Sequence, residues 1–201
     1  MSTSFAAAGF LRTFFAFSAL CLMTACAFNP QQVNLSPAIG NSTSDVGKGI
    51  TVAVKVADER ATKHLGYRGF AYGNAAQITA KQDVAAVVRD TLVASLERKG
   101  FKVTAYDDRY RPNLVFEVRL LEYVSTQNLF TFTIRVNSTI KATARNNKEA
   151  FEKTYRAENS EDVAIVPTAE ANERWINKVF SDILNQIVED EALYKFLKQV
   201  D

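Results

Sequence analysis

Apolar residues at alternate positions mark one strand early in the chain and three longer segments in its second half. Residues 50–57 (ITVAVKVA) alternate β-branched residues with smaller or polar ones, which is typical of a strand. The alternation returns in residues 113–124, 129–145 and 149–159. In the first two of these, the expected inward positions are Leu114, Phe116, Val118 and Leu120, then Phe130, Phe132, Ile134, Val136, Ile140 and Ala142. Strict alternation leaves one face solvated, so the sequence predicts an antiparallel meander with hairpin turns near Asn128 and Asn146.

Two further segments show the helical period. In residues 79–101 the apolar residues recur three or four apart, Thr79 and Gln82 resemble a capping box, and Gly100 supplies a left-handed stop. A second helix opens at Thr168, and a short helical turn follows it. A short strand, FKVTAY at residues 101–106, is expected directly after the first helix. The order β-α-β-β-β-β-α-α predicts an α+β fold, a two-layer sandwich of a mostly antiparallel sheet with two main helices packed on one face.

The first 25 residues differ from the rest of the chain. They carry one charge, Arg12, which is followed by the apolar run TFFAFSALCLMTA at positions 13–25. A membrane-spanning helix needs about 20 apolar residues, so this run is too short for one and fits the apolar region of a secretory signal. A core segment is the alternative, but an apolar run behind a basic residue and before small residues favours a cleaved signal peptide over residues 1–25.

The end of this segment resembles the bacterial lipoprotein box, in which an aliphatic residue, a small or polar one and a small one precede a cysteine. Here Met23, Thr24 and Ala25 precede Cys26. The resemblance implies that the sulfur of Cys26 takes a diacylglyceryl group and that the signal is cut before it. The freed amine then receives a fatty acid such as palmitate. Each buried methylene contributes about 0.8 kcal/mol, so three acyl chains anchor a protein permanently. Ala27 in place of an aspartate implies sorting to the outer membrane, with the domain facing the periplasm.

Cysteine content and charge narrow the chemistry of the mature chain. The chain has two cysteines, Cys21 and Cys26, and Cys21 would leave with the signal, so a disulfide, a cysteine metal site and a cysteine nucleophile are excluded. The formal net charge is +2, and it falls to +1, or 23 basic against 22 acidic residues, once Arg12 is removed. This balance shows no electrostatic footprint for nucleic acid.

Behind the signal, the chain divides into a tether and one domain. Residues 26–49 contain Pro, Asn, Ser and Gly throughout, and they predict an acylated N-terminus followed by a flexible tether. Within this stretch Leu35 and Ile39 are apolar and could pack on the domain. Residues 50–201 suit a single α+β periplasmic domain.

Several of these segments together resemble the YajG-type lipoproteins of proteobacteria. The likeness covers the lipoprotein box, LSP at residues 35–37, ADER at residues 57–60 and most of residues 84–197, including TIRVNSTIKATARNN and KTYRAEN. It implies a lipoprotein of undefined biochemical role, in which Cys26 is the one functional position that carries over. It supplies no catalytic residue, metal or cofactor.

Residues suited to catalysis are few. His64 is the single histidine, so a histidine metal cluster or a serine–histidine relay has one member at most, and a solvated histidine is favoured. Adjacent carboxylates such as Asp107 and Asp108 point in different directions, which disfavours the acid–base pair of an envelope hydrolase. Asp58 and Arg60 leave the first strand together, where they could contact a partner or form an ion pair that holds the loop. The sequence therefore predicts no enzyme and no bound metal or cofactor.

The connection from Asp58 to about Ile78 is the candidate interaction surface. Its segment HLGYRGFAYGN carries aromatic residues that a disordered loop tends to lack, and Tyr and Arg are enriched at interface hot spots. The aromatics could instead fold back as a lid over the end of the sheet. The candidate residues are Asp58, Arg60, Tyr67, Arg68, Phe70 and Tyr72.

The favoured hypothesis is a non-enzymatic module for protein interaction or envelope assembly. Cys26 would hold it on the lipid bilayer, and its partner would be another envelope protein. The alternative is a small-ligand or glycan-binding carrier in the periplasm, which would show an enclosed apolar pocket between sheet and helices. The sequence leaves the oligomeric state open.

Overall fold

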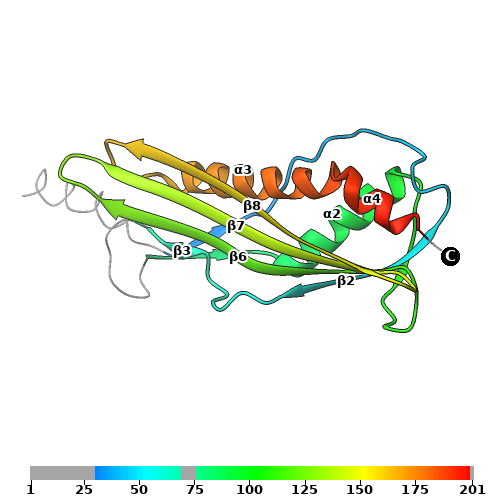
Figure 1. Ribbon diagram of the computed structural model, residues 1–201. Helices are drawn as coiled ribbons and strands as arrows, with labels where there is room; N and C mark the ends of the chain where they lie inside the picture. The colour runs from blue at the N-terminus through cyan, green and yellow to red at the C-terminus, as the bar shows by residue number, and fades with distance from the viewer. Residues whose placement is uncertain (1–29, 69–75, 200–201) are drawn as a thin grey trace, which may run out of the picture.

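The computed structural model describes residues 30–68 and 76–199, so Cys26, Phe70 and Tyr72 lie outside the described residues. The described part forms one eight-stranded sheet and three helices that pack against one of its faces (Figure 1). The strands are β1 (Gln31–Val33), β2 (Thr51–Asp58), β3 (Gly66–Tyr67), β4 (Gln77–Ala80), β5 (Lys102–Ala105), β6 (Asn113–Gln127), β7 (Phe132–Arg145) and β8 (Ala150–Val163). The helices are α2 (Val84–Arg98), α3 (Ala169–Val188) and α4 (Glu191–Leu197).

Three long antiparallel strands form the largest part of the sheet. β6 pairs with β7, and β7 pairs with β8, over nearly their whole lengths. Tight turns at residues 128–131 and 146–149 join them, so both expected hairpins are confirmed. The alternation sets the two faces: Phe116, Ile134 and Ile140 are buried, whereas Arg119 and Arg135 are exposed. The helices therefore cover the apolar face, and the opposite face is polar.

Two of the expected inward positions are wrong. A β-bulge between Val118 and Leu120 shifts β6 by one residue against β7, so that Leu121 rather than Leu120 enters the core. One inserted residue has this effect because successive side chains point to opposite faces. Phe130 lies in the β6–β7 turn and is exposed, because the pairing of these strands ends where Gln127 meets Phe132.

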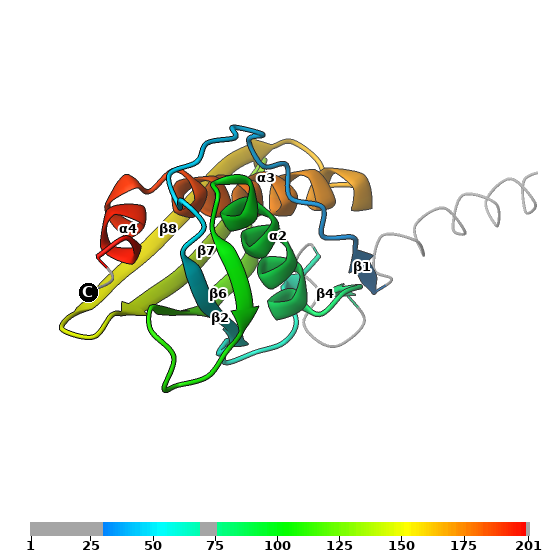
Figure 2. The same ribbon diagram turned by 90° about the vertical axis from the view of Figure 1, so that its right-hand side faces the viewer.

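The remaining strands make the sheet mixed. Four of its seven strand pairs are parallel, namely β1–β4, β2–β5, β2–β6 and β3–β6, and three are antiparallel, namely β3–β4, β6–β7 and β7–β8. The expected two-layer sandwich of a mostly antiparallel sheet with two main helices is therefore wrong. The chain forms a curled mixed sheet with three helices (Figure 2). Alternation tells which face a side chain occupies, but it does not tell whether neighbouring strands run parallel.

The sequence predicted the N-cap of α3 correctly but not that of α2. The N-cap of α2 is Asp83, whose side chain accepts a hydrogen bond from the N–H of Ala86, whereas Thr79 lies in β4. The N-cap of α3 is Thr168, as expected, and the apolar stripe of α3 that includes Phe180 is buried. Within the described ranges, no helix is both long and apolar enough to cross a bilayer.

Residues 31–40 run along α3 instead of forming part of a flexible tether (Figure 2). We call this segment the strap. From Asn34 to Gly40, every second backbone N–H of the strap donates to a side chain of α3. Successive acceptor residues on α3 are four positions apart. Four helical residues rise about 6.0 Å and two extended residues about 6.6 Å, so the two repeats stay in step. The pairs are Asn34 N to Glu173 Oε2 at 3.0 Å, Ser36 N to Asn177 Oδ1 at 2.8 Å, Ala38 N to Ser181 Oγ at 2.9 Å, and Gly40 N to Asn185 Oδ1 at 3.0 Å.

The flexible tether expected over residues 26–49 is therefore wrong for the strap. Leu35 is buried in the core and Ile39 packs against it, so these two apolar residues do pack on the domain. The side-chain amides of Asn177 and Asn185 also donate to strap carbonyls, at 2.9 Å and 3.0 Å. The strap thus satisfies its backbone on helix side chains rather than on water, which fixes its course.

Candidate interaction surface

The predicted interaction residues lie where the strands that pair with one side of β6 are interrupted. β2 and β3 both run parallel to β6, with Asp58 opposite Val118 and Gly66 opposite Tyr123. Between these two points β6 advances by four residues, 119–122, whereas the neighbouring chain uses seven, 59–65. The chain therefore leaves the sheet after β2 and rejoins it as β3. We call residues 58–68 the edge segment.

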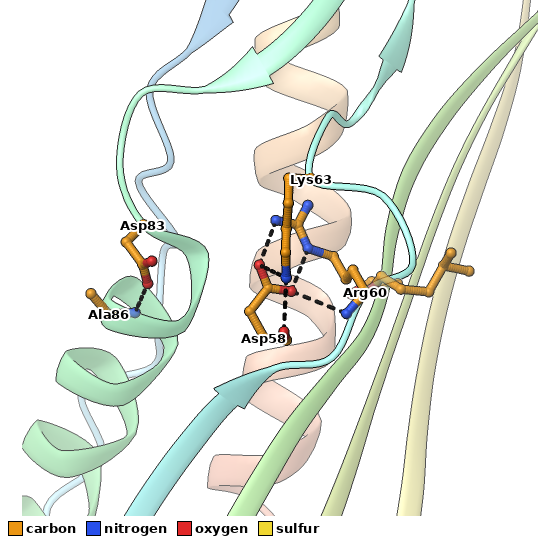
Figure 3. A network of polar contacts seen from close by, with 7 residues as sticks. Asp58, Arg60, Lys63, Asp83 and Ala86 are labelled. Carbon is orange, nitrogen blue, oxygen red and sulfur yellow. Dashed lines mark hydrogen bonds and ion pairs between the residues drawn. The ribbon is translucent and has the colours of Figure 1, made fainter.

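An ion pair holds the beginning of the edge segment (Figure 3). Nε and Nη2 of Arg60 donate to the two carboxylate oxygens of Asp58 at 2.8 Å and 2.9 Å, and Lys63 Nζ lies 3.1 Å from Asp58 Oδ2. The side chains of Arg60 and Asp58 are only 4% and 14% exposed. Burial alone raises the pKa of Asp58, but the hydrogen bonds from Arg60 and Lys63 outweigh this effect and lower the pKa to about 2.

Asp58 and Arg60 thus brace the loop and offer little surface to a partner. This arrangement is the ion pair that the sequence left open as the alternative to a contact role. Lys63 is the exposed member of the group, with a side chain that is 66% exposed. The ion pair fixes the loop because two parallel charge-assisted hydrogen bonds define the orientation of the guanidinium.

The end of the edge segment is fixed by close backbone contact with β6. The N–H of Leu65 donates to the carbonyl of Ile78 at 2.7 Å, and the N–H of Tyr123 donates to the carbonyl of Leu65 at 2.6 Å. Gly66 has φ +156°, and a Cβ placed on it would lie 2.0 Å from the carbonyl oxygen of Tyr123. A glycine is therefore required at position 66, where the backbone passes this close to the carbonyl of Tyr123. Leu65 is buried in the core, so this part of the segment packs on the domain.

Tyr67 is the predicted residue that remains available at the surface, with 36% of it exposed. Its ring lies 5.0 Å from the ring of His64 at an interplanar angle of 56°, so the two rings form a tilted pair. Arg68 follows directly, is half-buried, and donates from its N–H to the carbonyl of Ala76 at 2.7 Å. The structure therefore brings the rings of His64 and Tyr67 together and places Arg68 next to Tyr67 in the chain, while Phe70 and Tyr72 lie outside the described residues.

Two buried polar networks were not foreseen from the sequence. The hydroxyl of Tyr155 and Nζ of Lys153 donate to Asp190 Oδ2 at 2.5 Å and 2.7 Å. Burial, followed by the hydrogen bond to Asp190, raises the pKa of Tyr155. Burial raises the pKa of Asp190 by itself, but the bonds from Lys153 and Tyr155 outweigh it and lower that pKa. Asp190 also caps α4, accepting from two of its amides, so this network joins α4 to the sheet.

The second network ties the strap to the sheet. The hydroxyl of Tyr123 donates to Asn172 Oδ1 at 2.7 Å, and Asn172 Nδ2 donates to Gln31 Oε1 at 3.0 Å. Gln31 Nε2 then donates to the carbonyl of Ala169 at 2.6 Å. Each member satisfies its neighbour, which makes the network structural rather than reactive. A repeat of polar residues every fourth position on α3 was the available signal for the strap contacts.

The space enclosed between the helices and the sheet is too small for the pocket of a carrier. A cavity between the helices and the sheet, lined by Leu96, Phe116 and Tyr194 among others, has a volume of about 10 Å³. Small-molecule pockets commonly measure about 300–1,000 Å³. A larger hollow of about 750 Å³ lies open beside the strap and the first half of α3, and its lining includes Glu173, Arg174 and Lys178. Across residues 30–68 and 76–199, no three His, Cys, Asp or Glu side chains gather as a metal site would require.

Comparisons with known proteins place the chain among lipoproteins. The family model Lipoprotein_16, described as uncharacterized lipoprotein, matches residues 37–198. The fold is similar to that of a DUF330-family protein from Xanthomonas campestris, with a TM-score of 0.53 and 12% identity over 84% of this chain and 97% of that one. A lower similarity, with a TM-score of 0.33 and 10% identity, relates it to lipoprotein GNA1162 from Neisseria meningitidis, over 71% of this chain and 99% of that one. None of the curated proteins matches the chain.

Proposed function

Because the chain belongs to the uncharacterized lipoprotein family, as its resemblance to YajG-type lipoproteins implied, we propose that it is a non-enzymatic interaction module at the outer membrane. As a member of a lipoprotein family, it is a membrane-anchored protein of the cell envelope. The more specific parts of the proposal are the signal peptide over residues 1–25, acylation of Cys26 and placement of the domain in the periplasm. These parts rest on the lipoprotein box and on Ala27.

The preorganised edge segment is the observation that supports an interaction role. Its base is fixed by the Asp58–Arg60 ion pair, and its end is fixed against Tyr123. A surface held in this way loses little conformational entropy when a partner binds, which favours affinity. Tyr67 and the half-buried Arg68 are residue types that concentrate binding energy at protein interfaces. We therefore assign the contact with an envelope protein to Tyr67 and Arg68.

The anchor is tested by replacing Cys26 with serine. The precursor of Cys26→Ser is expected to stay uncut and to take up no labelled fatty acid, because the thiolate sulfur is the acceptor of the first lipid group. Metabolic labelling with radioactive palmitate and the mobility of the protein on gels report both effects. Cys21→Ser is the matched control, since it removes the chain's other cysteine and should leave processing and labelling normal. A Cys26→Ser chain that is cut and labelled like the parent would contradict the assignment.

The partner surface is tested by changing Tyr67 and Arg68 together to alanine. We expect the crosslinked adduct formed in intact envelopes to be lost, with a thermal unfolding midpoint close to that of the parent. The matched control is Arg109→Ala with Tyr110→Ala, which removes the same two residue types from the exposed loop before β6, where Tyr110 is 40% exposed. The control should keep the adduct. Retention of the adduct by the Tyr67 and Arg68 variant, or a much lower midpoint, would show that the edge segment is structural only.

A further inference from the structure

Three large apolar side chains are exposed together at one end of the long strands. Leu129, Phe130 and Ile165 are 86%, 84% and 74% exposed, well above Tyr67 and Tyr110 among the large hydrophobic residues of the described part. Leu129 and Phe130 form the β6–β7 turn. Because Val163 of β8 pairs with Phe132, the chain after β8 continues past β7 to the same end. We call these three residues the apolar tip, and Figure 1 shows the turn projecting from that end of the molecule.

The apolar tip is built on a fixed turn, and the two short segments that form it contain no charged residue. The N–H of Asn128 donates to the carbonyl of Thr131 at 2.8 Å, and Asn128 Nδ2 donates to Thr133 Oγ1 at 2.8 Å. Thr133 Oγ1 in turn donates to Asp162 Oδ1 at 2.6 Å, which joins the turn to β8. The two segments that meet here, NLFTF at residues 128–132 and VAIVP at residues 163–167, contain no charged residue. Exposed apolar groups of this kind mark protein or membrane contacts.

The direction of β1 shows which end of the domain its first residue faces. β1 is parallel to β4, β4 is antiparallel to β3, and β3 is parallel to β6, so β1 runs opposite to β6. The first residue of β1, Gln31, is therefore on the side of this strand that faces the end at which β6 turns into β7. Gln31, Ile78, Gly66 and Tyr123 lie at one level across these strands. At about 3.3 Å per residue, the six residues from Tyr123 to Leu129 carry the apolar tip about 20 Å beyond that level.

Cys26 is close in the sequence to the first residue of β1, so a lipid group on it can lie only a short distance from the domain. Four residues lie between Cys26 and Gln31, and the resulting five Cα–Cα steps reach at most about 18 Å. The hydrogen-bonded strap begins at Gln31, so it removes the slack that a flexible tether over residues 26–49 would have supplied. A lipid group on Cys26 thus reaches nearly to the level of the apolar tip, on the same end of the domain.

We propose that Leu129, Phe130 and Ile165 insert into the bilayer surface that holds the acylated Cys26. The domain then stands on the membrane with its long strands directed away from the lipid, and the tip is a second contact beside the acyl chains. This inference rests on the proposed acylation of Cys26. A lipid surface is the occupant that fits, because the reach of five residues keeps this end of the domain beside the membrane. Apolar and aromatic side chains at that depth enter the boundary between headgroups and acyl chains.

The test places a single tryptophan at each end of the long strands. The chain has one native tryptophan, Trp175, so Trp175→Phe supplies the background. Phe130→Trp reports the apolar tip, and Glu149→Trp in the β7–β8 turn at the opposite end is the matched control. The full acylated proteins are reconstituted in vesicles of phosphatidylethanolamine and phosphatidylglycerol, with or without brominated acyl chains, and mass spectrometry of the N-terminal peptide establishes acylation. For Phe130→Trp we expect a blue-shifted emission that loses most of its intensity with brominated lipid, whereas Glu149→Trp keeps its emission.

Each outcome separates the two proposals. If Cys26 carries no lipid in protein taken from its native envelope, the proposed anchor fails. If the chain is acylated but brominated lipid quenches neither tryptophan, the proposed lipid anchor is supported and the proposed insertion of the apolar tip is wrong. A blue shift at position 130 without quenching by bromine would mean that protein covers the tip, as in pairing of two copies, and this result would also overturn the proposal.

Discussion

Replacing Asp58 with alanine is expected to lower the free energy of unfolding by about 3–5 kcal/mol, because the buried guanidinium of Arg60 loses its counter-charge. The side chain of Arg60 is 4% exposed, and both carboxylate oxygens of Asp58 accept hydrogen bonds from it. An uncompensated buried charge is costly, whereas removal of the whole pair is often tolerated. Arg60→Met added to Asp58→Ala should therefore recover most of the lost stability. Urea unfolding of the detergent-solubilised mature chain measures all three values.

The chain contains a matched control for this experiment. Asp107 and Arg109 show the same spacing and the same two hydrogen bonds, at 3.2 Å and 3.0 Å, but their side chains are 47% and 91% exposed. Water screens such a pair, so Asp107→Ala should leave the unfolding midpoint nearly unchanged. An equal loss for Asp58→Ala and Asp107→Ala, or a small loss for both, would show that burial does not give the Asp58–Arg60 pair its importance.

The same pair predicts a pH dependence. The pKa of Asp58 falls from its ordinary value of 3.8 to about 2 in the folded chain. Because the folded value lies below the unfolded one, the contribution of Asp58 is complete above about pH 4 and is lost as the pH falls toward about 2. The integrated effect is about 2 kcal/mol. The difference in stability between the parent and Asp58→Ala should therefore shrink over this interval, and a difference that stays constant would contradict the lowered pKa.

The elements of the fold were predicted better than their arrangement. β6, β7, β8 and α3 are long enough for the periods of two and 3.6 residues to appear in the sequence. β1, β3 and β4 have only two to four residues each, so no period marks them, and the parallel pairs β1–β4 and β3–β6 were hidden with them. The other two parallel pairs, β2–β5 and β2–β6, join longer segments, but alternation does not give the relative direction of two strands. The bulge after Val118 was also hidden, because Leu120 and Leu121 are both leucine and either could face inward.

The candidate surface was predicted in part, because its contacts join residues that are distant in the sequence. Asp58 and Arg60 are two residues apart, so an ion pair could be considered from the sequence alone. Position 66 must be glycine because its backbone lies against the carbonyl of Tyr123. The register of β3 against β6 places these two residues side by side, and the sequence does not show that register. The strap was interpreted as a tether because its polar composition is that of a linker. Its partners are polar side chains of α3, more than 130 residues away.

The second large effect is expected in the core, where Phe180→Ala should lower the free energy of unfolding by about 3–5 kcal/mol through lost burial and the cavity that remains. Phe180 lies in the middle of α3 and is fully buried. Ile176 and Leu184, four residues before and after it on α3, are buried in the same core cluster. These neighbours belong to a rigid helix, so they can close the cavity only partly, and the loss should approach the upper part of this range.

Phe130→Ala is the matched control, because it makes the same chemical change at a residue that is 84% exposed. In detergent-free urea unfolding of residues 27–201, which lack the signal and the acylated cysteine, Phe130→Ala should leave the midpoint nearly unchanged while Phe180→Ala lowers it strongly. The comparison also bears on the apolar tip, since a side chain that contributes nothing to folding is free to be used for binding. A large loss of stability for Phe130→Ala would mean that the turn packs against the domain in solution, and the tip would then be part of the core rather than a contact surface.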